Sequence, residues 1–224
     1  MPFLAVVAAA GKSSRFGGVK KEYRPLHGKP VLAHCLSLFL DQDDCALCVA
    51  VVPPGGVPDA RAALGQGFMA SYASRLLFAE GGAERSDSVL AGLRALEASG
   101  ADPEQLVLVH DGARPFASAA LLRRVLDGCA ETGACVPGVP VTDTIKRVDA
   151  AGFVVEHPPR AFLRAVQTPQ GFRFRELLDA YLRLGPARTE ATDDAELWSR
   201  AGRSLMLAEG ERSNVKITFP EDLP

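Results

Sequence analysis

The amino-acid sequence predicts an α/β fold with a doubly wound, mostly parallel sheet, and two observations carry this prediction. Apolar runs of strand length alternate along the chain with segments of helical periodicity. The apolar runs are also continuous, whereas a strand with one solvated face alternates apolar and polar residues. Strands that are apolar on both faces are typical of a parallel sheet covered by helices on both sides.

The predicted strands and helices follow one another in order along the chain. Strands are expected at residues 3–10, 45–52, 75–80 and 106–110. Helices are expected at residues 30–40, 85–99 and 117–131, and the stretch that ends at residue 73 has a mixed pattern. The last two helices each carry a one-sided apolar stripe, which is the face expected to pack on the sheet. The stripes are Val89, Leu90, Leu93 and Leu96, and Leu121, Leu122, Val125 and Leu126.

Residues 142–172 interrupt this alternation and predict a protruding β-arm. Two β-rich pieces flank a turn-like cluster from Asp149 to Gly152, which indicates a hairpin. Two strands that project alone are marginally stable in water. We therefore expect a second copy of the chain to cover the arm, which makes the protein a homodimer. The alternative is that the arm folds back on its own domain.

The composition excludes several classes of partner. The chain has 224 residues with 25 Lys or Arg and 27 Asp or Glu, so its net charge of −2 gives no footprint for nucleic acid. The first apolar run, residues 3–10, lacks a preceding basic segment and is too short to span a bilayer, which argues against secretion and against membrane insertion. We expect a cytoplasmic protein that forms one large domain over residues 1–224.

The five cysteines predict buried thiols rather than disulfides or a metal site. None lies in a Cys/His cluster with zinc-ligand spacing. Cys45 and Cys48 form a Cys-x-x-Cys pattern, but they fall in a predicted buried strand, where residues three apart point to opposite faces. Core thiols in a reducing compartment are the favoured interpretation.

The segment from Leu4 to Tyr23, LAVVAAAGKSSRFGGVKKEY, predicts a loop that brings backbone N–H groups and cations to an anion. Two familiar phosphate loops do not fit it. A Walker A loop needs glycine where Val6 stands, and a dinucleotide fingerprint needs glycine where Ser13 stands. The loop follows the first predicted strand, and ligands of doubly wound sheets collect beyond the carboxyl ends of the strands.

Three further segments share this position or lie near the C-terminus: GGAERSDS, HDGARP and NVKITFPEDL. The helix expected after Gly81 and Gly82 offers an anion site at its N-terminus, with Ser86, Asp87 or Ser88 as its cap. Plain capping without ligand contact is the alternative.

Together these segments resemble the 2-C-methyl-D-erythritol 4-phosphate cytidylyltransferase family, within the larger nucleotidyltransferase group. The similarity spans nearly the whole chain and is carried by AAAGKSSRFG with KKEY downstream, GGAERSDSVLAGL, HDGARP, VTDTIKR, QTPQGF, TDDAE and NVKITFPEDL. The chain departs from the family pattern at Ser13, where glycine is usual, and at Gly112, where alanine is usual. The resemblance implies a Rossmann-like nucleotidyltransferase domain over residues 1–224, with residues 142–172 as its dimerisation arm.

The reaction that the resemblance implies is transfer of CMP from CTP to 2-C-methyl-D-erythritol 4-phosphate, with release of pyrophosphate, in non-mevalonate isoprenoid biosynthesis. The attacking phosphate oxygen is already anionic, so the reaction needs cations and alignment more than a general base. Mg²⁺ is the implied cofactor, because a divalent ion neutralises the leaving pyrophosphate. No carboxylate cage is visible, so the phosphates are expected to supply most of its ligands and no residue is assigned as a metal ligand.

The resemblance also implies roles for single residues. Its catalytic set is Arg15, Lys21, Arg160 and Lys216. Its nucleotide-binding set is Ala9, Ala10, Gly11, Gly82, Ser88 and Gly112, and its substrate-binding set is Asp111, Arg114, Thr144 and Thr168. Arg15 and Lys21 would stabilise charge at the α-phosphate, and Arg160 and Lys216 would position the attacking phosphate. Arg160 and Thr168 fall in the arm, which the family places in the active site of the partner subunit.

Plainer interpretations stand beside these roles. Arg15 and Lys21 are a solvated basic loop in the alternative view, and Asp111 and Arg114 form a mutual salt bridge. His110 is expected to be structural, because the reaction needs no general acid or base. The acidic residues at 190–196 are expected to form a solvated cluster at the start of a helix rather than a metal site.

Four alternative functions remain open. The nearest is a cytidylyltransferase for another polyol phosphate, such as ribitol 5-phosphate, and a guanylyl- or uridylyltransferase is more distant. A non-catalytic nucleotide-binding module is less favoured because the loop cations are present. A dehydrogenase is less favoured still, because the ribose-binding acidic residue and the full glycine fingerprint are missing.

Overall fold

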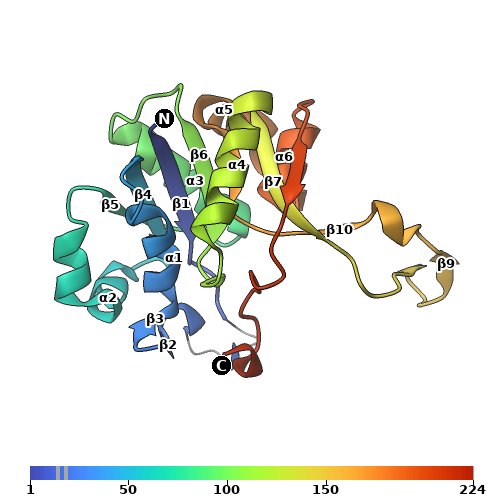
Figure 1. Cartoon of the computed structure of the whole chain (residues 1–224), viewed down its shortest axis with the longest axis horizontal. Helices are drawn as coiled ribbons and strands as arrows, with labels where there is room; N and C mark the ends of the chain where they lie inside the picture. Colours follow the sequence, from blue (N-terminus) through green and yellow to red (C-terminus); the bar gives the residue numbers. More distant parts are fainter. Residues whose placement is uncertain (14–15, 18–19, 224) are drawn as a thin grey trace.

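A mixed, mostly parallel sheet forms the centre of the computed structural model, which describes residues 1–13, 16–17 and 20–223 (Figure 1). Its strand order is β10-β7-β11-β6-β1-β4-β5, and β12 pairs with β7. Strands β1, β4, β5 and β6 run parallel, whereas β10 and β11 run antiparallel to their neighbours. The fold class predicted from the sequence is confirmed. The strands are β1 (Phe3–Ala8), β4 (Cys45–Val52), β5 (Leu76–Glu80), β6 (Leu106–Asp111), β7 (Ala134–Pro140), β10 (Arg164–Val166), β11 (Gln170–Arg173) and β12 (Met206–Glu209).

Helices cover both faces of this sheet. They are α1 (Val31–Leu40), α2 (Val57–Ser71), α3 (Arg85–Ala98), α4 (Ala119–Thr132), α5 (Phe174–Leu184) and α6 (Asp194–Arg200). The alternation of side chains along β1 divides the core: Phe3, Ala5 and Val7 pack in one cluster with α1, α2 and α4. Leu4 and Val6 pack in the other with α3, α5 and α6. Among the described residues, no helix is both long and apolar enough to cross a membrane.

The start of α3 corrects one detail of the sequence interpretation. The helix is capped by Glu84, and not by Ser86, Asp87 or Ser88, because the chain enters the helix at Arg85. Asp87 still takes part, since its Oδ2 accepts a hydrogen bond of 3.2 Å from the Glu84 backbone N–H.

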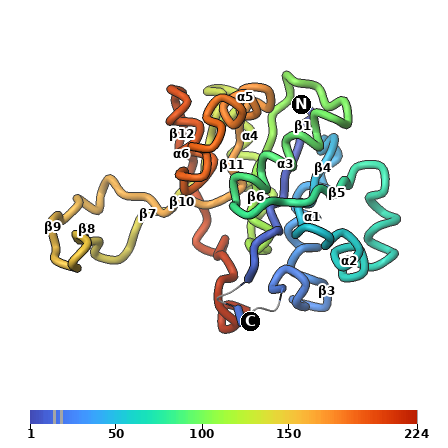
Figure 2. Tube along the Cα trace, turned by 180° about the vertical axis from the view of Figure 1, so that it is seen from behind, coloured from blue at the N-terminus to red at the C-terminus, as the bar shows by residue number. Residues whose placement is uncertain are grey.

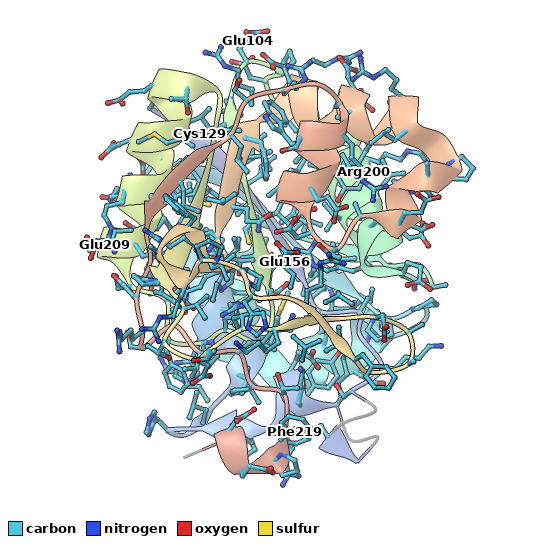
Figure 3. The ribbon with its side chains drawn as sticks, turned by 90° about the vertical axis from the view of Figure 1, so that its right-hand side faces the viewer. Glu104, Cys129, Glu156, Arg200, Glu209 and Phe219 are labelled. Carbon is cyan, nitrogen blue, oxygen red and sulfur yellow. The ribbon has the colours of Figure 1, made fainter. Side chains whose placement is uncertain are left out.

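The arm projects from one side of the body in both views (Figures 1 and 2). It contains β8 (Arg147–Val148), β9 (Val154–Glu156) and the short helix η3 (Arg160–Phe162). The hairpin prediction is confirmed, because β8 pairs antiparallel with β9 and the Asp149 backbone N–H donates to the Phe153 carbonyl at 2.9 Å. Phe153 and Phe162 are 72% and 85% exposed. Figure 3 faces the tip of the arm, where Glu156 lies.

The arm ends earlier than the predicted boundary at residue 172. Residues Arg164–Val166 and Gln170–Arg173 are strands β10 and β11 of the central sheet. The reason is burial: Phe172 is fully buried and its ring centroid lies 5.4 Å from that of Trp198. The second β-rich piece of the sequence therefore divides between β9 in the arm and these strands of the body.

All five cysteines are buried and free. Cys45 and Cys48 lie in β4, as predicted, but they pack in the same core cluster and not on opposite faces, because the register between β1 and β4 shifts between Phe3 and Leu4. Burial raises the pKa of the Cys45 thiol to about 12 and that of Cys48 well above its ordinary value. These thiols are core residues and are protonated at neutral pH.

Candidate active site

A cavity of about 650 Å³ lies at the carboxyl ends of β1 and β6. Ala8, the last residue of β1, pairs in register with Asp111, the last residue of β6. This is the edge at which doubly wound sheets bind their ligands. The residues predicted from the sequence that line the cavity are Ala10, Gly11, Lys21, Gly82, Ser88, Asp111, Gly112 and Lys216.

The first loop is held by a lysine that the sequence analysis did not single out. The Lys20 Nζ donates to the carbonyl oxygens of Ala9 and Gly11 at 2.5 and 2.6 Å. It also forms an ion pair of 3.2 Å with the buried Glu22. Burial lowers the pKa of Lys20, and the Glu22 carboxylate offsets part of this effect. The doubled lysine in KKEY was the available signal, but spacing alone did not show which lysine turns inward.

Lys21 connects the first loop to the C-terminal segment. Its Nζ donates to the Ile217 carbonyl oxygen at 2.6 Å, next to Lys216. This hydrogen bond helps to place Lys21 and Lys216, two predicted catalytic lysines from opposite ends of the chain, at one cavity. Arg15, which was predicted to act with Lys21, lies outside the described residues.

Asp111 is surrounded by three cations. Its carboxylate lies 2.8 Å from Lys216 Nζ, 3.3 Å from Arg85 Nε and 3.6 Å from Arg114 Nε. Burial acts to raise the pKa of Asp111, but Arg85, Lys216 and Arg114 together hold it well below its ordinary value. The salt bridge between Asp111 and Arg114 is therefore present, yet it is one part of a larger cationic cluster. Asp111, Arg85, Arg114 and Lys216 by themselves carry more positive than negative charge, and Arg85 is also paired with Asp194.

A second cavity of about 400 Å³ lies next to the first and shares Lys216 with it. Arg114 and Arg212 also line it, and the described residues that form its wall include no acidic side chain. Arg114 is fixed there because its Nη1 donates to the Asn214 carbonyl oxygen at 2.8 Å. Burial lowers the pKa of Arg114, and Asp111 works against this. A basic wall without carboxylates suits a phosphate group.

Thr168 lies in the body, next to Asp111 of its own chain, and not in the projecting arm. It is 4% exposed, and its Oγ1 accepts a hydrogen bond of 3.1 Å from the Asp111 backbone N–H. The same oxygen lies 2.9 Å from His110 Nδ1, and His110 Nε2 lies 3.1 Å from the Arg114 carbonyl oxygen. Thr168 therefore fixes the backbone at the end of β6.

His110 is fully buried, and burial lowers its pKa to about 4. Both ring nitrogens contact protein groups, which suits a neutral imidazole that donates from Nε2 and accepts at Nδ1. This arrangement supports the structural role expected for His110.

Neither Thr144 nor Arg160 lines a cavity in the single chain, but Arg160 contacts Thr142, which lines the smaller cavity. Thr144 is exposed, and Arg160 Nη1 donates to the Thr142 carbonyl oxygen at 2.6 Å within the arm. Ala9 is fully buried behind the cavity wall. The chain thus lines its two cavities with body residues of the predicted site, and with neither Thr144 nor Arg160.

The acidic segment at residues 190–196 begins a helix, as predicted, but it is not wholly solvated. Asp193 caps α6, since its Oδ1 accepts from the Glu196 backbone N–H at 2.8 Å. Asp194 is fully buried, forms an ion pair of 2.8 Å with Arg85 and accepts a hydrogen bond from the Tyr181 hydroxyl. The sequence shows four acids close together, whereas the fold turns one of them inward against an arginine 109 residues away.

Residues 3–224 match the protein family described as IspD: 2-C-methyl-D-erythritol 4-phosphate cytidylyltransferase. The chain belongs to this family. The crystal structure of the 2-C-methyl-D-erythritol 4-phosphate cytidylyltransferase from Thermus thermophilus is 36% identical, covers 100% of this chain and 96% of its own, and gives a TM-score of 0.78. The crystal structure of the 4-diphosphocytidyl-2C-methyl-D-erythritol synthase from Anaerococcus prevotii is 27% identical to this chain. The match covers 99% of this chain and 93% of that one, with a TM-score of 0.83.

The chain spans about half the length of the curated relatives it matches. The bifunctional enzyme IspD/IspF from Nitrobacter hamburgensis is 46% identical over 220 residues, which are 97% of this chain and 52% of that protein. The structure of the bifunctional IspDF from Campylobacter jejuni is 27% identical, with a TM-score of 0.73 over 99% of this chain and 53% of that one.

The two departures from the IspD family pattern have local explanations. Ser13 has φ of 50°, a left-handed conformation that favours glycine, and its Oγ donates to Glu22 Oε2 at 3.3 Å. The Gly112 N–H donates to the Ala8 carbonyl oxygen at 2.9 Å, and a Cβ at this position would lie 2.9 Å from Ala9 Cβ. Gly112 therefore lets the ends of β1 and β6 approach closely.

Proposed function

We propose that this chain transfers CMP from CTP to 2-C-methyl-D-erythritol 4-phosphate, giving 4-diphosphocytidyl-2-C-methyl-D-erythritol and pyrophosphate. The observation that carries the proposal is the cationic cluster of Arg85, Arg114 and Lys216 around Asp111, between the two cavities. The larger cavity has the volume for a nucleotide, and the smaller has a basic wall for a phosphate monoester. Family membership supplies the identity of the two substrates.

The reaction proceeds by attack of a phosphate oxygen of the polyol phosphate on the α-phosphorus of CTP. The new phosphorus–oxygen bond forms while the bond from the α-phosphorus to the bridging oxygen of the β-phosphate breaks, and pyrophosphate leaves with that electron pair. Lys21 and Lys216 border the larger cavity and lower the repulsion between the two anionic substrates. Arg114 holds the attacking phosphate at the smaller cavity. His110, buried and neutral, is not needed to move a proton.

Mg²⁺ fits this site as a companion of the triphosphate. Within residues 1–13, 16–17 and 20–223 no group of three metal-ligating side chains is found, and the charge of Asp111 is already shared by three cations. The phosphate oxygens would hold most of the ion, and the carboxylates that line the larger cavity are Glu22, Glu84 and Asp111. When bound, the ion neutralises charge on the leaving pyrophosphate.

A homodimer completes the site in this proposal. The arm exposes apolar side chains that its own chain leaves uncovered: Ile145, Val148, Phe153, Val154, Val155 and Phe162. Exposed apolar surface of this kind marks an interface, and burial against a second copy would bring Arg160 and Thr144 to the partner's smaller cavity. The buried thiols support a reducing compartment, and we place the protein in the cytoplasm.

The proposal is tested by measuring pyrophosphate release with each of the four nucleoside triphosphates against methylerythritol phosphate and ribitol 5-phosphate. CTP with methylerythritol phosphate is expected to give the highest kcat/KM. A preference for ribitol 5-phosphate would show that the proposed acceptor is wrong. A preference for another nucleoside triphosphate would show that the proposed donor is wrong. No release with any pair, from protein that binds CTP, would leave a non-catalytic nucleotide-binding module.

A further inference from the structure

Arg85 bridges two carboxylates that come from different parts of the chain. Its Nε lies 3.3 Å from Asp111 Oδ1, and its Nη2 lies 2.8 Å from Asp194 Oδ2. Arg85 is the first residue of α3 and lines the larger cavity. A planar guanidinium with both ends bound has one orientation, so the position of one carboxylate depends on the other.

Asp194 is the firmly fixed end of this bridge. It is fully buried; its Oδ2 contacts Arg85 and its Oδ1 accepts from the Tyr181 hydroxyl. A buried carboxylate needs such partners, because an unpaired charge in the interior is strongly destabilising. Burial and the Asp194 charge raise the pKa of Tyr181 well above its ordinary value, so the hydroxyl remains a donor.

The helix that carries Asp194 is tied to the central sheet. Gln170 of β11 donates from Nε2 to Asp193 Oδ2 at 2.9 Å, and its Oε1 accepts from the Ala195 backbone N–H at 3.1 Å. Gln170 in turn pairs in register with Val109 of β6, two residues before Asp111. In Figure 3, Arg200 marks the C-terminal end of this helix, α6. The start of α6 is thus fixed relative to the strand that ends at Asp111.

We propose that Arg85 is a positioning residue for Asp111 and that Asp194 holds the Arg85 guanidinium in that role. This inference rests on the proposed function. Arg85 occupies Oδ1 of Asp111, which leaves Oδ2 for Lys216 and Arg114 at 2.8 and 3.6 Å. With Arg85 released, both oxygens of Asp111 can turn to Lys216 and Arg114. Those cations would then be withdrawn from the attacking phosphate.

Asp194→Asn tests the proposal, because it removes the charge that holds Arg85 and touches no substrate. We expect kcat/KM for the polyol phosphate to fall about 10-fold, with KM for CTP changed less than about 3-fold. Asp194→Glu, which restores the charge, is expected to recover activity to within about 3-fold of wild type.

Arg188→Gln is the matched control. Arg188 Nη2 forms an ion pair of 2.7 Å with Asp87, so this variant also breaks a link between the C-terminal part of the chain and the first turn of α3. It leaves Arg85 and Asp111 untouched. Equal kcat/KM per folded protein in Asp194→Asn and Arg188→Gln would overturn the positioning role and leave only a structural one.

Two further outcomes are decisive. If Asp194→Asn does not fold, Tyr181→Phe removes only the hydroxyl that supports Asp194, and an unchanged kcat/KM for the polyol phosphate would overturn the proposal; a fall of about 3-fold would support it. The wild type is assayed first. Absence of turnover there counts against the proposed function, whereas an active wild type with equally active variants counts against the positioning role alone.

Discussion

The end of β6 and the arm differ in how their predicted site residues are held. At the end of β6, His110 is fully buried, Thr168 is 4% exposed, and both make hydrogen bonds that fix the backbone of Asp111 and Arg114. In the arm, Phe162 is 85% exposed and the Arg160 guanidinium donates to the Thr142 carbonyl oxygen. One chain therefore fixes the site residues at the end of β6 by itself, whereas the apolar side chains of the arm are left exposed by their own chain.

Of the variants proposed here, Lys216→Ala in the body is expected to have the largest effect. We expect kcat/KM to fall about 10³-fold, because the cation between the two cavities is removed where negative charge accumulates. Steady-state kinetics and thermal melting measure the effect, with the exposed Lys29→Ala as control. A loss below about 10-fold would remove Lys216 from the catalytic set.

The pH dependence of the free energy of unfolding tests how His110 is held in the body. The folded pKa of His110 is about 4, below the ordinary value of 6.5, because the buried ring resists protonation. As the pH falls, His110 is protonated in the unfolded chain before it is protonated in the folded chain. The contribution of His110 to the free energy of unfolding is therefore complete above about pH 6.5 and is lost as the pH falls toward 4. It amounts to about 3 kcal/mol.

Denaturant unfolding between pH 7 and pH 4 measures this contribution. His110→Gln should flatten that part of the stability curve, and the exposed His157→Gln in the arm is the matched histidine variant. The same slope in wild type and His110→Gln would show that His110 is not held neutral.

On the arm side, Arg160→Ala should raise KM for the polyol phosphate about 30-fold, because one phosphate contact is lost. Calorimetric affinity for CTP should change less than about 3-fold. Arg147→Ala is the control within the same arm, since its exposed ion pair with Glu156 contributes little. Weakened CTP binding with an unchanged KM for the polyol phosphate would reverse the assignment.

The smallest expected effect is on association. Phe162→Asp places a charge in the apolar surface of the arm and should weaken the dimer about 10-fold or more, measured by equilibrium sedimentation across a concentration series. Leu182→Asp, at a 46% exposed position of α5 in the body, is the control. Equal association of both variants would place the interface elsewhere.

The sequence predicted β1, β4, β5 and β6 because their apolar runs are long and uninterrupted, but it did not predict β7 or β12. The 45–52 run coincides with β4, and the predicted helix at 85–99 differs from α3 by one residue. Residues 53–73 were harder to interpret, because Gly65 with φ of 79° interrupts α2 and its apolar period. A local apolar pattern predicts an uninterrupted strand or helix, but it does not predict a break within a helix.

The candidate site was predictable where it follows a strand directly, as at Asp111 and Gly112. Lys20, Arg85 and Asp194 were missed because their roles arise from contacts made only in the fold: Arg85 reaches Asp194 across 109 positions. Thr168 was expected in the arm because its segment is continuous in sequence with the hairpin, whereas burial of Phe172 draws that segment into the sheet.

Complementation between two impaired variants tests most directly whether each site combines the body of one chain with the arm of another. Arg160→Ala and Lys216→Ala are mixed, allowed to exchange subunits, and assayed at a polyol phosphate concentration that is limiting. A heterodimer would contain one site with both residues intact, so random exchange should restore about a quarter of the wild-type activity. Heterodimers that form, as shown by mass-tagged subunits, but have no more activity than the average of the two variants would contradict a shared site.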